Sequence, residues 1–402
     1  MSASQTAGAS PAADTTQPLG PLAGIRVLDL TGFLSGPFGT QILGDLGAEV
    51  LKIEPPIGDN SRTVPPHFVD GDSVYYLSTN RNKRSAVVDL KSPEGKQFVL
   101  DLVDRSDIVV ENFRPGALQR LGLDYETVAA RAPHIIWCAI SGFGQDGPYA
   151  DRPAYDMIVQ AYSGGMSLTG ERGGTPVRAG IPVGDLTAGL YGVIGVLAAL
   201  EQRRRTGRGE YIDVSMLDCQ VALLSYQAAY YLHSGAVPGP QGRSHDSIPT
   251  YRCFTASDGI DVAVTANTEG MWRALCRALD REQYIDDERF LTLADRHRNR
   301  AVLEPLLEEA FLARTADDWV ATLTDAGVPV APVNTLDRTF RDPQVLHREM
   351  VVELAREEGG DPVRVVGNPL KFAGQAQTPL RYPPGKGEDD DVIARIARGD
   401  DA

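Results

Sequence analysis

Cysteine and histidine are scarce in this chain, which has four cysteines and six histidines among its 402 residues. The cysteines lie far apart and form no CxxC pair, so we expect reduced thiols in a cytoplasmic protein. The histidines show neither HxxxH nor HExxH spacing, and we therefore expect no metal site. The cysteines are Cys138, Cys219, Cys253 and Cys276.

Positive charge is also in short supply, because 39 lysines and arginines face 54 aspartates and glutamates, giving a net charge of −15. This balance argues against nucleic acid or an anionic membrane as a partner. The longest apolar stretches, such as residues 194–200, fall far short of the roughly 20 residues of a membrane span. Residues 1–19 are small and polar without an apolar centre, so they predict a disordered leader and not a signal peptide.

The chain does contain short β-branched runs that alternate with helical stretches from residue 24 onward. This alternation predicts βαβ units, an α/β fold with a mostly parallel sheet, and ligands at the carboxyl ends of its strands. Two long helical patterns follow, at residues 186–205 and 213–232. The predicted strands lie at 25–30, 49–53, 85–90, 107–110 and 135–140, and the predicted helices between them include 38–46 and 93–104.

The length exceeds the ~250–300 residues at which a single core stops growing, so we expect two domains. Residues 234–249 are rich in glycine, proline and serine and predict a linker. Beyond it, residues 251–254 and 261–265 predict a hairpin around Asp258 and Gly259, with helices after it. This second part therefore predicts a smaller α+β domain.

One glycine motif invites a dinucleotide-binding interpretation, because residues 142–147 match GxGxxG after a predicted strand. That fingerprint also needs a helix that begins at the third glycine, whereas Pro148 and Pro153 follow here. A glycine-rich turn is the favoured interpretation.

Two polar loops flank predicted strands, one before residues 85–90 and one after residues 107–110. Amide groups and guanidinium forks at strand ends suit an adenine ring and phosphates. The alternative is a pair of solvated loops with ordinary ion pairs. The residues concerned are Asn82, Lys83, Arg84, Asn112, Phe113 and Arg114, with Arg120 beyond the second loop.

Asp185 stands directly before the helical pattern at 186–205. It could be an N-cap that accepts hydrogen bonds from the first free backbone N–H groups. It could also be a carboxylate nucleophile exposed to a cleft, kept ionised at neutral pH by the helix N-terminus.

Several motifs in order resemble the type III CoA-transferase family, which includes formyl-CoA and carnitine CoA-transferases and the α-methylacyl-CoA racemases. The resemblance runs from about residue 20 to about residue 375. The motifs are PLAGIRVLDL (21–30), SGP (35–37), LGAEVLKIE (46–54), NKRS (82–85), VENFRPG (110–116), SGFG (141–144) and TGRG (206–209).

The resemblance implies a large Rossmann-like domain built from both ends of the chain, with a small domain inserted. It also implies an interlocked homodimer in which each subunit is a ring threaded through the other. The predicted division is a leader at 1–19, a large CoA-binding domain at 20–233 with 332–385, a small α+β domain at 234–331 and, from its composition, a solvated acidic tail at 386–402.

The family's functional residues carry over by motif. Asp185 occupies the place of the nucleophilic aspartate, and CoA enters as a thioester substrate with no separate cofactor. The implied partners are an acyl-CoA and a carboxylic acid. The implied CoA-binding residues are Asn82, Lys83, Arg84, Asn112, Phe113, Arg114, Arg120 and Tyr155.

Tyr155 separates the two reaction types in this family. Racemases of the family carry a histidine base thirty residues before the aspartate, and here Tyr155 stands thirty residues before Asp185. A tyrosine with a pKa near ~10 is a poor base at neutral pH, so CoA transfer is favoured. The alternatives are a racemase or isomerase that uses Asp156 or Asp185 as its base, and a CoA-binding protein without activity.

Overall fold

The computed structural model describes residues 20–356, 359–374 and 378–400. Contacts divide the chain into two units, of which the second consists of Met157–Val183 and Gln220–Arg348. These boundaries differ from those predicted, because the chain leaves the large unit at Cys219 and not at the glycine- and proline-rich stretch after residue 233. Composition marks where turns are easy, whereas the boundary of a unit depends on where contacts change. The predicted leader lies outside the described residues.

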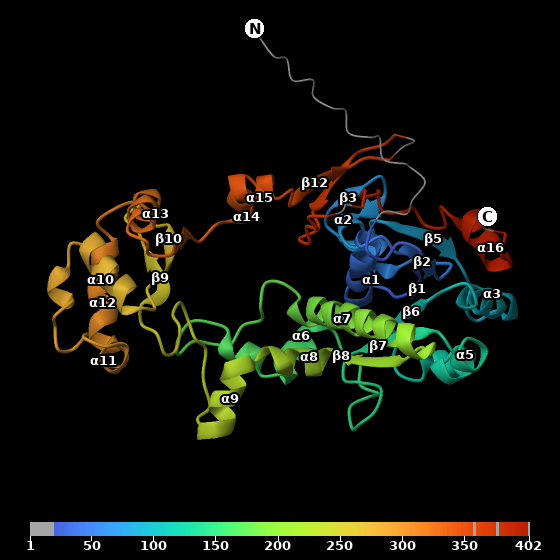
Figure 1. Ribbon diagram of the computed structural model, residues 1–402, viewed down its shortest axis with the longest axis horizontal. Coiled ribbons are helices and arrows are strands. Elements are labelled where there is room, and N and C mark those ends of the chain that lie inside the picture. Colours follow the sequence, from blue (N-terminus) through green and yellow to red (C-terminus); the bar gives the residue numbers. More distant parts are fainter. Residues whose placement is uncertain (1–19, 357–358, 375–377, 401–402) are drawn as a thin grey trace, which may run out of the picture. The chain divides into compact units, whose positions relative to one another are not determined.

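The large unit is built on a six-stranded parallel sheet with the order β5-β2-β1-β6-β7-β8 (Figure 1). Counted along the chain, this is the 3-2-1-4-5-6 order of a doubly wound sheet. The predicted α/β class with a parallel sheet is confirmed. The strands are β1 (Arg26–Leu30), β2 (Glu49–Glu54), β5 (Lys83–Val87), β6 (Ile108–Glu111), β7 (Ile136–Ser141) and β8 (Tyr211–Ser215).

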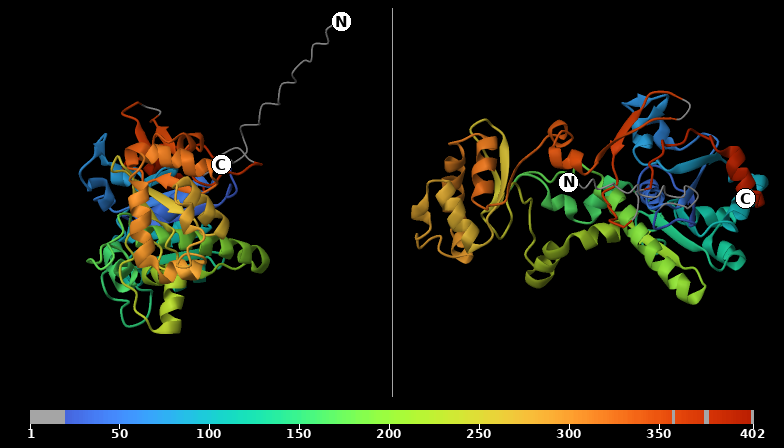
Figure 2. Two further views of the ribbon diagram at one scale, coloured as in Figure 1. Left: turned by 90° about the vertical axis from the view of Figure 1, so that its left-hand side faces the viewer. Right: turned by 45° about the horizontal axis from the view of Figure 1, so that its top comes forward.

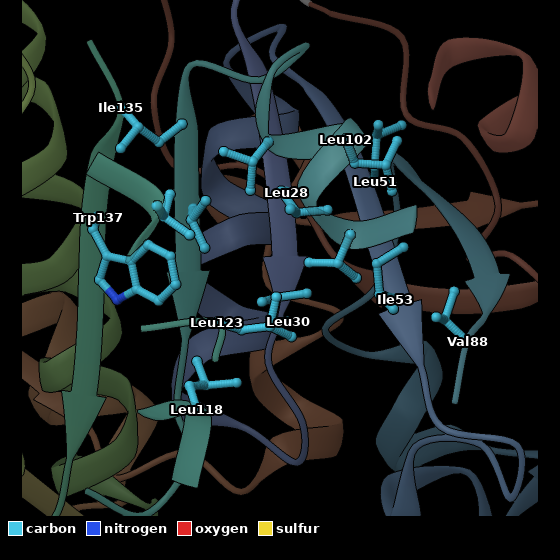
Figure 3. Close-up of a cluster of buried hydrophobic side chains, with 14 of the residues drawn as sticks. Leu28, Leu30, Leu51, Ile53, Val88, Leu102, Leu118, Leu123, Ile135 and Trp137 are labelled. Carbon is cyan, nitrogen blue, oxygen red and sulfur yellow. The ribbon is translucent and has the colours of Figure 1, made fainter. Parts of the chain in front are cut away.

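One face of this sheet carries the larger apolar core. Leu28 pairs in register with Leu51 on one side and Val109 on the other, and all three side chains are buried. Figure 3 shows the neighbouring strands contributing side chains to one cluster, with Trp137 at one end. Both faces are covered, so the strands read as continuous apolar runs. The helices that contribute side chains to this core are α3 (Pro93–Val103), α4 (Ala117–Leu121), α5 (Tyr125–Arg131) and α16 (Asp390–Arg398).

The opposite face carries α1 (Ser35–Asp45) and α7 (Val183–Thr206), which approach each other closely at two glycines. A Cβ on Gly189 would lie 2.6 Å from the carbonyl oxygen of Ser35, and one on Gly39 would lie 3.1 Å from the carbonyl oxygen of Gly189. Only glycine permits this approach, which brings the beginning of α7 beside the β1–α1 loop.

The acidic run near the C-terminus forms a helix and not a solvated tail. Ile393 and Ile396 of α16 are buried in the large core, and α16 packs against α3 and β5 (Figure 1). Asp389 accepts hydrogen bonds from the N–H of Ser85 at 3.0 Å and from Arg84 at 3.0 Å. The carboxylates therefore bond to the edge strand while the isoleucines behind them enter the core.

The predicted helix at 213–232 is wrong in its first part. The structure continues β8 to Ser215, and the helical remainder is divided into α8 (Met216–Leu223) and α9 (Ser225–Ser234). Ser225 has a φ of 47°, in the left-handed region, which interrupts the helix.

The second unit contains a three-stranded antiparallel sheet with the order β11-β10-β9. Its hairpin joins β9 (Tyr251–Thr255) to β10 (Asp261–Thr265), as the sequence predicts, and its helices gather on one face of the sheet (Figure 2). Phe254 and Phe311 stack within its core at 4.2 Å between ring centroids. The other elements are β11 (Val330–Pro332), α10 (Glu269–Ala278), α11 (Leu293–Arg298), α12 (Arg300–Phe311), α13 (Ala316–Asp325), α14 (Leu336–Thr339) and α15 (Pro343–His347).

Among the described residues, α7 is the one helix that is long and apolar enough to cross a membrane by length and composition. Half of its most apolar stretch is buried inside the fold, and its glycines pack against α1 at Gly189, β7 at Gly192 and β8 at Gly195. These contacts are those of a core helix in a globular protein.

Candidate active site

The strand order places a ligand site where β1 and β6 lie side by side. From this pair the chain proceeds toward β2 and β5 in one direction and toward β7 and β8 in the other, and ligands bind such sheets outside the carboxyl ends of these strands. There the Asn112 side chain accepts a hydrogen bond from the N–H of Gly32 at 2.9 Å and donates one to its carbonyl oxygen at 2.8 Å. The loops after β1 and β6 are therefore joined at the predicted ligand edge.

Asp185 lies in the first turn of α7, two residues inside the helix, and so is not its N-cap. The N–H of Gly184 donates instead to the carboxylate of Asp156, at 2.8 Å. Asp156 is the first residue of α6 (Asp156–Tyr162). The Asp185 carboxylate is left to face a cavity.

This cavity has a volume of about 210 Å³ and is called here the Asp185 pocket. Burial, and then the charge of Asp156, raises the pKa of Asp185 to about 7. The helix N-terminus therefore does not hold the pKa of this carboxyl at its usual low value, because burial and the charge of Asp156 both disfavour the ionised form. The predicted site residues that line the Asp185 pocket are Asn112, Phe113, Arg114, Tyr155 and Asp185.

Tyr155 reaches this pocket because the loop of residues 142–147 approaches the chain before α6 closely. A Cβ on Gly142 would lie 2.2 Å from the Cβ of Ala154. The GxGxxG segment is thus a turn, as the sequence favours, and glycine is needed there for packing.

A second cavity of about 400 Å³ opens at the carboxyl ends of β1, β2, β5 and β6 and is called here the Lys91 pocket. It shares three lining residues with the Asp185 pocket: Phe33, Asn112 and Phe113. Lys91 is exposed at this pocket and has no ion-pair partner in the part of the chain that the structure describes. The sequence prediction did not include Lys91, although its position directly after the strand predicted at 85–90 was a usable signal.

Arg114 and Arg120 are exposed, and neither has an acidic partner within the described ranges, but only Arg114 lines one of these pockets. Arg114 lines the Asp185 pocket, whereas Arg120 lies on α4, with its guanidinium next to Gly116. Unpaired guanidinium groups suit phosphate or carboxylate ligands.

The structure does not bring Asn82, Lys83 and Arg84 into either pocket. Lys83 begins β5 and lies opposite Val50 near the beginning of β2. The segment is therefore at the amino-terminal ends of the strands, whereas both pockets are at the carboxyl ends. The Lys83 side chain is fully buried, 3.0 Å from Asp29, and Arg84 pairs with Asp389 at 3.0 Å. A strand of five residues is roughly 16 Å long, so the residues just before it and the residues just after it lie at opposite ends of the strands.

No group of three or more His, Cys, Asp or Glu side chains gathers as possible metal ligands among residues 20–356, 359–374 and 378–400.

Comparison with known proteins agrees with this geometry. The family model described as CoA-transferase family III matches residues 22–390. The chain belongs to this family. It is similar to the succinyl-CoA:glutarate CoA-transferase of Homo sapiens, with 40% identity over 95% of this chain and 87% of the relative. It is also similar to the succinate–glutarate CoA-transferase of Agrobacterium fabrum, with 41% identity over 90% of this chain and 91% of the relative.

A solved structure gives the same result for the fold of the transferase. A CAIB/BAIF family protein from Brucella suis superposes with a TM-score of 0.84 and 38% identity, covering 94% of this chain and 100% of that protein. The predicted resemblance to type III CoA-transferases is confirmed. The protein is a CoA-transferase, which moves coenzyme A from an acyl-CoA donor to a carboxylic acid acceptor.

Proposed function

We propose that the transferase works through a covalent aspartyl-CoA thioester on Asp185. The observation that supports this most is the position of Asp185 in a pocket that shares three lining residues with a second cavity, which is large enough for part of a nucleotide. The thioester would lie at Asp185 and the nucleotide would extend toward Lys91. Exchange of one thioester for another needs little driving force, so the site mainly excludes water and positions groups.

The steps balance without a further reactant. The Asp185 carboxylate attacks the acyl-CoA carbonyl, giving an acyl-aspartyl anhydride and CoA thiolate. The thiolate attacks the aspartyl carbonyl and releases the donor acid. The acceptor carboxylate attacks the aspartyl-CoA carbonyl, giving a new anhydride and thiolate, and attack of that thiolate on the acceptor's acyl carbonyl forms the new acyl-CoA and frees Asp185.

We infer that both acids are dicarboxylic, as the names of the two relatives indicate for those proteins. Arg114 and Arg152 line the Asp185 pocket and suit a second carboxylate. Arg152 lies over the Tyr149 ring at 3.8 Å, which orients its guanidinium. The donor and acceptor would then enter the same pocket in turn.

For the CoA moiety we propose Asn112, Phe113, Arg114, Tyr155 and Lys91 as binding residues, with Arg120 as a further cation near the phosphates. This proposed set of CoA-binding residues excludes Asn82, Lys83 and Arg84, because they lie at the amino-terminal ends of the strands, away from both pockets. We also propose that the reaction needs no metal or separate cofactor, and that the enzyme is a cytoplasmic homodimer. Its four cysteines are free, which supports a reducing compartment.

Trapping of the covalent intermediate tests the mechanism. After incubation with succinyl-CoA, hydroxylamine should convert the Asp185 peptide to a hydroxamate that mass spectrometry identifies. Asp185→Ala should abolish both the label and glutarate-dependent transfer, with CoA affinity changed by less than about twofold. Asp151→Ala, which removes an exposed carboxylate from the neighbouring loop, is the matched control and should retain both. Transfer by the Asp185→Ala variant would disprove the proposal.

A further inference from the structure

Phe33 has an unusual backbone conformation at the edge of both pockets. Its φ is 63°, in the left-handed region that bulky residues rarely adopt. Such conformations persist only where the surroundings over-determine them, and they gather at functional sites. The side chain here is a large ring and not the glycine that this backbone would favour.

A buried ion pair fixes this conformation from one side. The Asp59 carboxylate accepts a hydrogen bond from the N–H of Phe33 at 3.2 Å and pairs with the Lys52 ammonium at 2.8 Å. Lys52 also donates to the carbonyl oxygen of Thr31 at 2.8 Å, and its side chain is completely buried. The pair thus holds the residues at both ends of the Thr31–Gly32–Phe33 turn.

Asn112 fixes the turn from the other side, since its amide group bonds to both the N–H and the carbonyl of Gly32. Every residue of the turn is therefore tied to a side chain of another element. Burial favours the neutral forms of Asp59 and Lys52. The charge of Lys52 nevertheless lowers the pKa of Asp59, and the charges of Asp29 and then Asp59 raise the pKa of Lys52, so both stay charged.

The ring held in this way lies where the two pockets meet. Phe33 lines both the Lys91 pocket and the Asp185 pocket, as do Asn112 and Phe113. Its ring meets the Tyr155 ring edge-on, with 6.0 Å between centroids and 80° between planes, and it remains 37% exposed. Part of the ring is therefore free to contact a ligand.

We propose that Phe33 is a binding residue for the arm of CoA that joins nucleotide to thioester, and that Asp59 and Lys52 are positioning residues that hold its ring in the passage between the two pockets. This inference rests on the proposed function, because it places an acyl-CoA across both cavities. The extended arm passes between the Phe33 ring and the Asn112–Phe113 loop, and the ring fixes how far the thioester reaches toward Asp185.

Replacement by glycine separates function from stability at this position. Phe33→Gly removes the ring and relieves the left-handed strain, so the melting temperature should be unchanged or higher. The KM for acyl-CoA and the Kd for CoA should each rise about tenfold, with a smaller change in kcat. Asp151→Ala, at an exposed position that lines neither pocket, is the control and should stay within about twofold of wild type in all three constants.

A double-mutant cycle tests the positioning role. Asp59→Asn should raise the KM for acyl-CoA in the wild-type background but have no further effect in Phe33→Gly, because the two residues act through one ring. Additive effects of the two substitutions would show that Asp59 does not act through Phe33 and would overturn that part of the proposal. If Asp59→Asn does not fold, the Phe33 variants still decide the binding role.

The outcomes distinguish this inference from the proposed function. Unchanged KM and Kd in Phe33→Gly, while the wild type transfers CoA, would overturn the role of Phe33 and leave the proposed function intact. Absence of transfer by the wild type would overturn the proposed function, and calorimetric titration with CoA alone would still test Phe33. An equal loss in Phe33→Gly and Asp151→Ala would also overturn the inference, since the loss would then not come from the ring.

Discussion

At the residue scale, the pair of carboxylates at the start of α6 and α7 decides the chemistry. Asp156 receives the Gly184 N–H, so Asp185 faces the cavity without that hydrogen bond. Burial and the charge of Asp156 both disfavour the ionised form of Asp185 and raise its pKa to about 7. A carboxylate destabilised in this way is a stronger nucleophile than an ordinary aspartate, but it is fully available only above neutral pH.

The raised pKa of Asp185 predicts an acid limb in the pH profile. Because the ionised form attacks, kcat/KM for acyl-CoA should fall roughly tenfold per pH unit below a midpoint near pH 7. Asp156→Asn removes the neighbouring negative charge and keeps an oxygen for the Gly184 N–H, so the midpoint should move to lower pH. Steady-state rates between pH 5 and 9 measure it, with Asp151→Ala as the control that should keep the wild-type midpoint. A midpoint that stays in place in Asp156→Asn would contradict the assignment.

The sequence alone allows Lys83 to be either a phosphate-binding residue or a buried structural residue. It is buried against Asp29 at 3.0 Å and donates to the carbonyl of Pro37 at 3.0 Å. Lys83→Met should therefore destabilise the enzyme by about 3 kcal/mol, because Asp29 loses a buried partner. Per folded enzyme, its KM for acyl-CoA should hardly change.

Arg120→Ala is the opposite case, because this exposed guanidinium has no ion pair among the described residues. Its melting temperature should stay the same while the KM for acyl-CoA rises by roughly tenfold. Thermal unfolding and steady-state kinetics on both variants check the contrast. A Lys83→Met enzyme with wild-type stability and a raised KM would restore the phosphate-binding interpretation.

At the scale of elements, the sequence predicts most of the large sheet. The runs at 25–30, 49–53 and 135–140 match β1, β2 and β7, because strands covered on both faces are continuous apolar runs. It fails at residues 213–215, where β8 passes directly into α8 and no turn residue marks the change. The direction of a strand decides whether a loop lies at the amino or the carboxyl ends of the strands. The position of Lys91 at the carboxyl ends was therefore predictable once the strands were known.

The close approach of α1 and α7 was not predictable, since it depends on contacts between segments about 150 residues apart. A Cβ on Gly189 would lie 2.6 Å from a backbone oxygen, which cannot move aside as a side chain can. Gly189→Ala should therefore shift the start of α7, lower the melting temperature and reduce kcat by roughly tenfold to a hundredfold.

Gly192→Ala in the same helix is the matched control for this prediction. There a Cβ would lie 3.3 Å from the sulfur of Cys138, a side-chain atom that can adjust. We expect kcat within about threefold of wild type for this variant. Equal losses in both variants would mean that the helix as a whole, and not its contact with α1, limits catalysis.

At the scale of the whole molecule, an exposed apolar face of α7 indicates contact with a partner. The glycines of this helix pack against α1 and the sheet, while Leu190, Ile194 and Leu197 share another face and are exposed, Ile194 by 59%. Such a helix, apolar on most of its circumference, is normally covered all round. A second copy of the chain is the occupant that the family resemblance implies. The threading of two chains through each other is likewise implied by the resemblance alone, because no pattern within one chain predicts it.

An interlocked dimer makes a prediction about exchange as well as about mass. Light scattering should give twice 43.3 kDa for the wild type, and Ile194→Glu should weaken the dimer because it places a charge in an apolar contact. Glu201→Gln, a change at an exposed position of the same helix, should leave the mass unchanged.

Mixing two differently tagged preparations of the wild type should produce no mixed dimers over days, because two threaded rings separate only when one of them unfolds. Unfolding and refolding the mixture together should produce mixed dimers in the statistical ratio. Mixed dimers that form within hours in native buffer would show a dimer joined only by surface contact, in which subunits dissociate without unfolding. A molecular mass of 43.3 kDa at all concentrations would instead leave the exposed face of α7 without this partner.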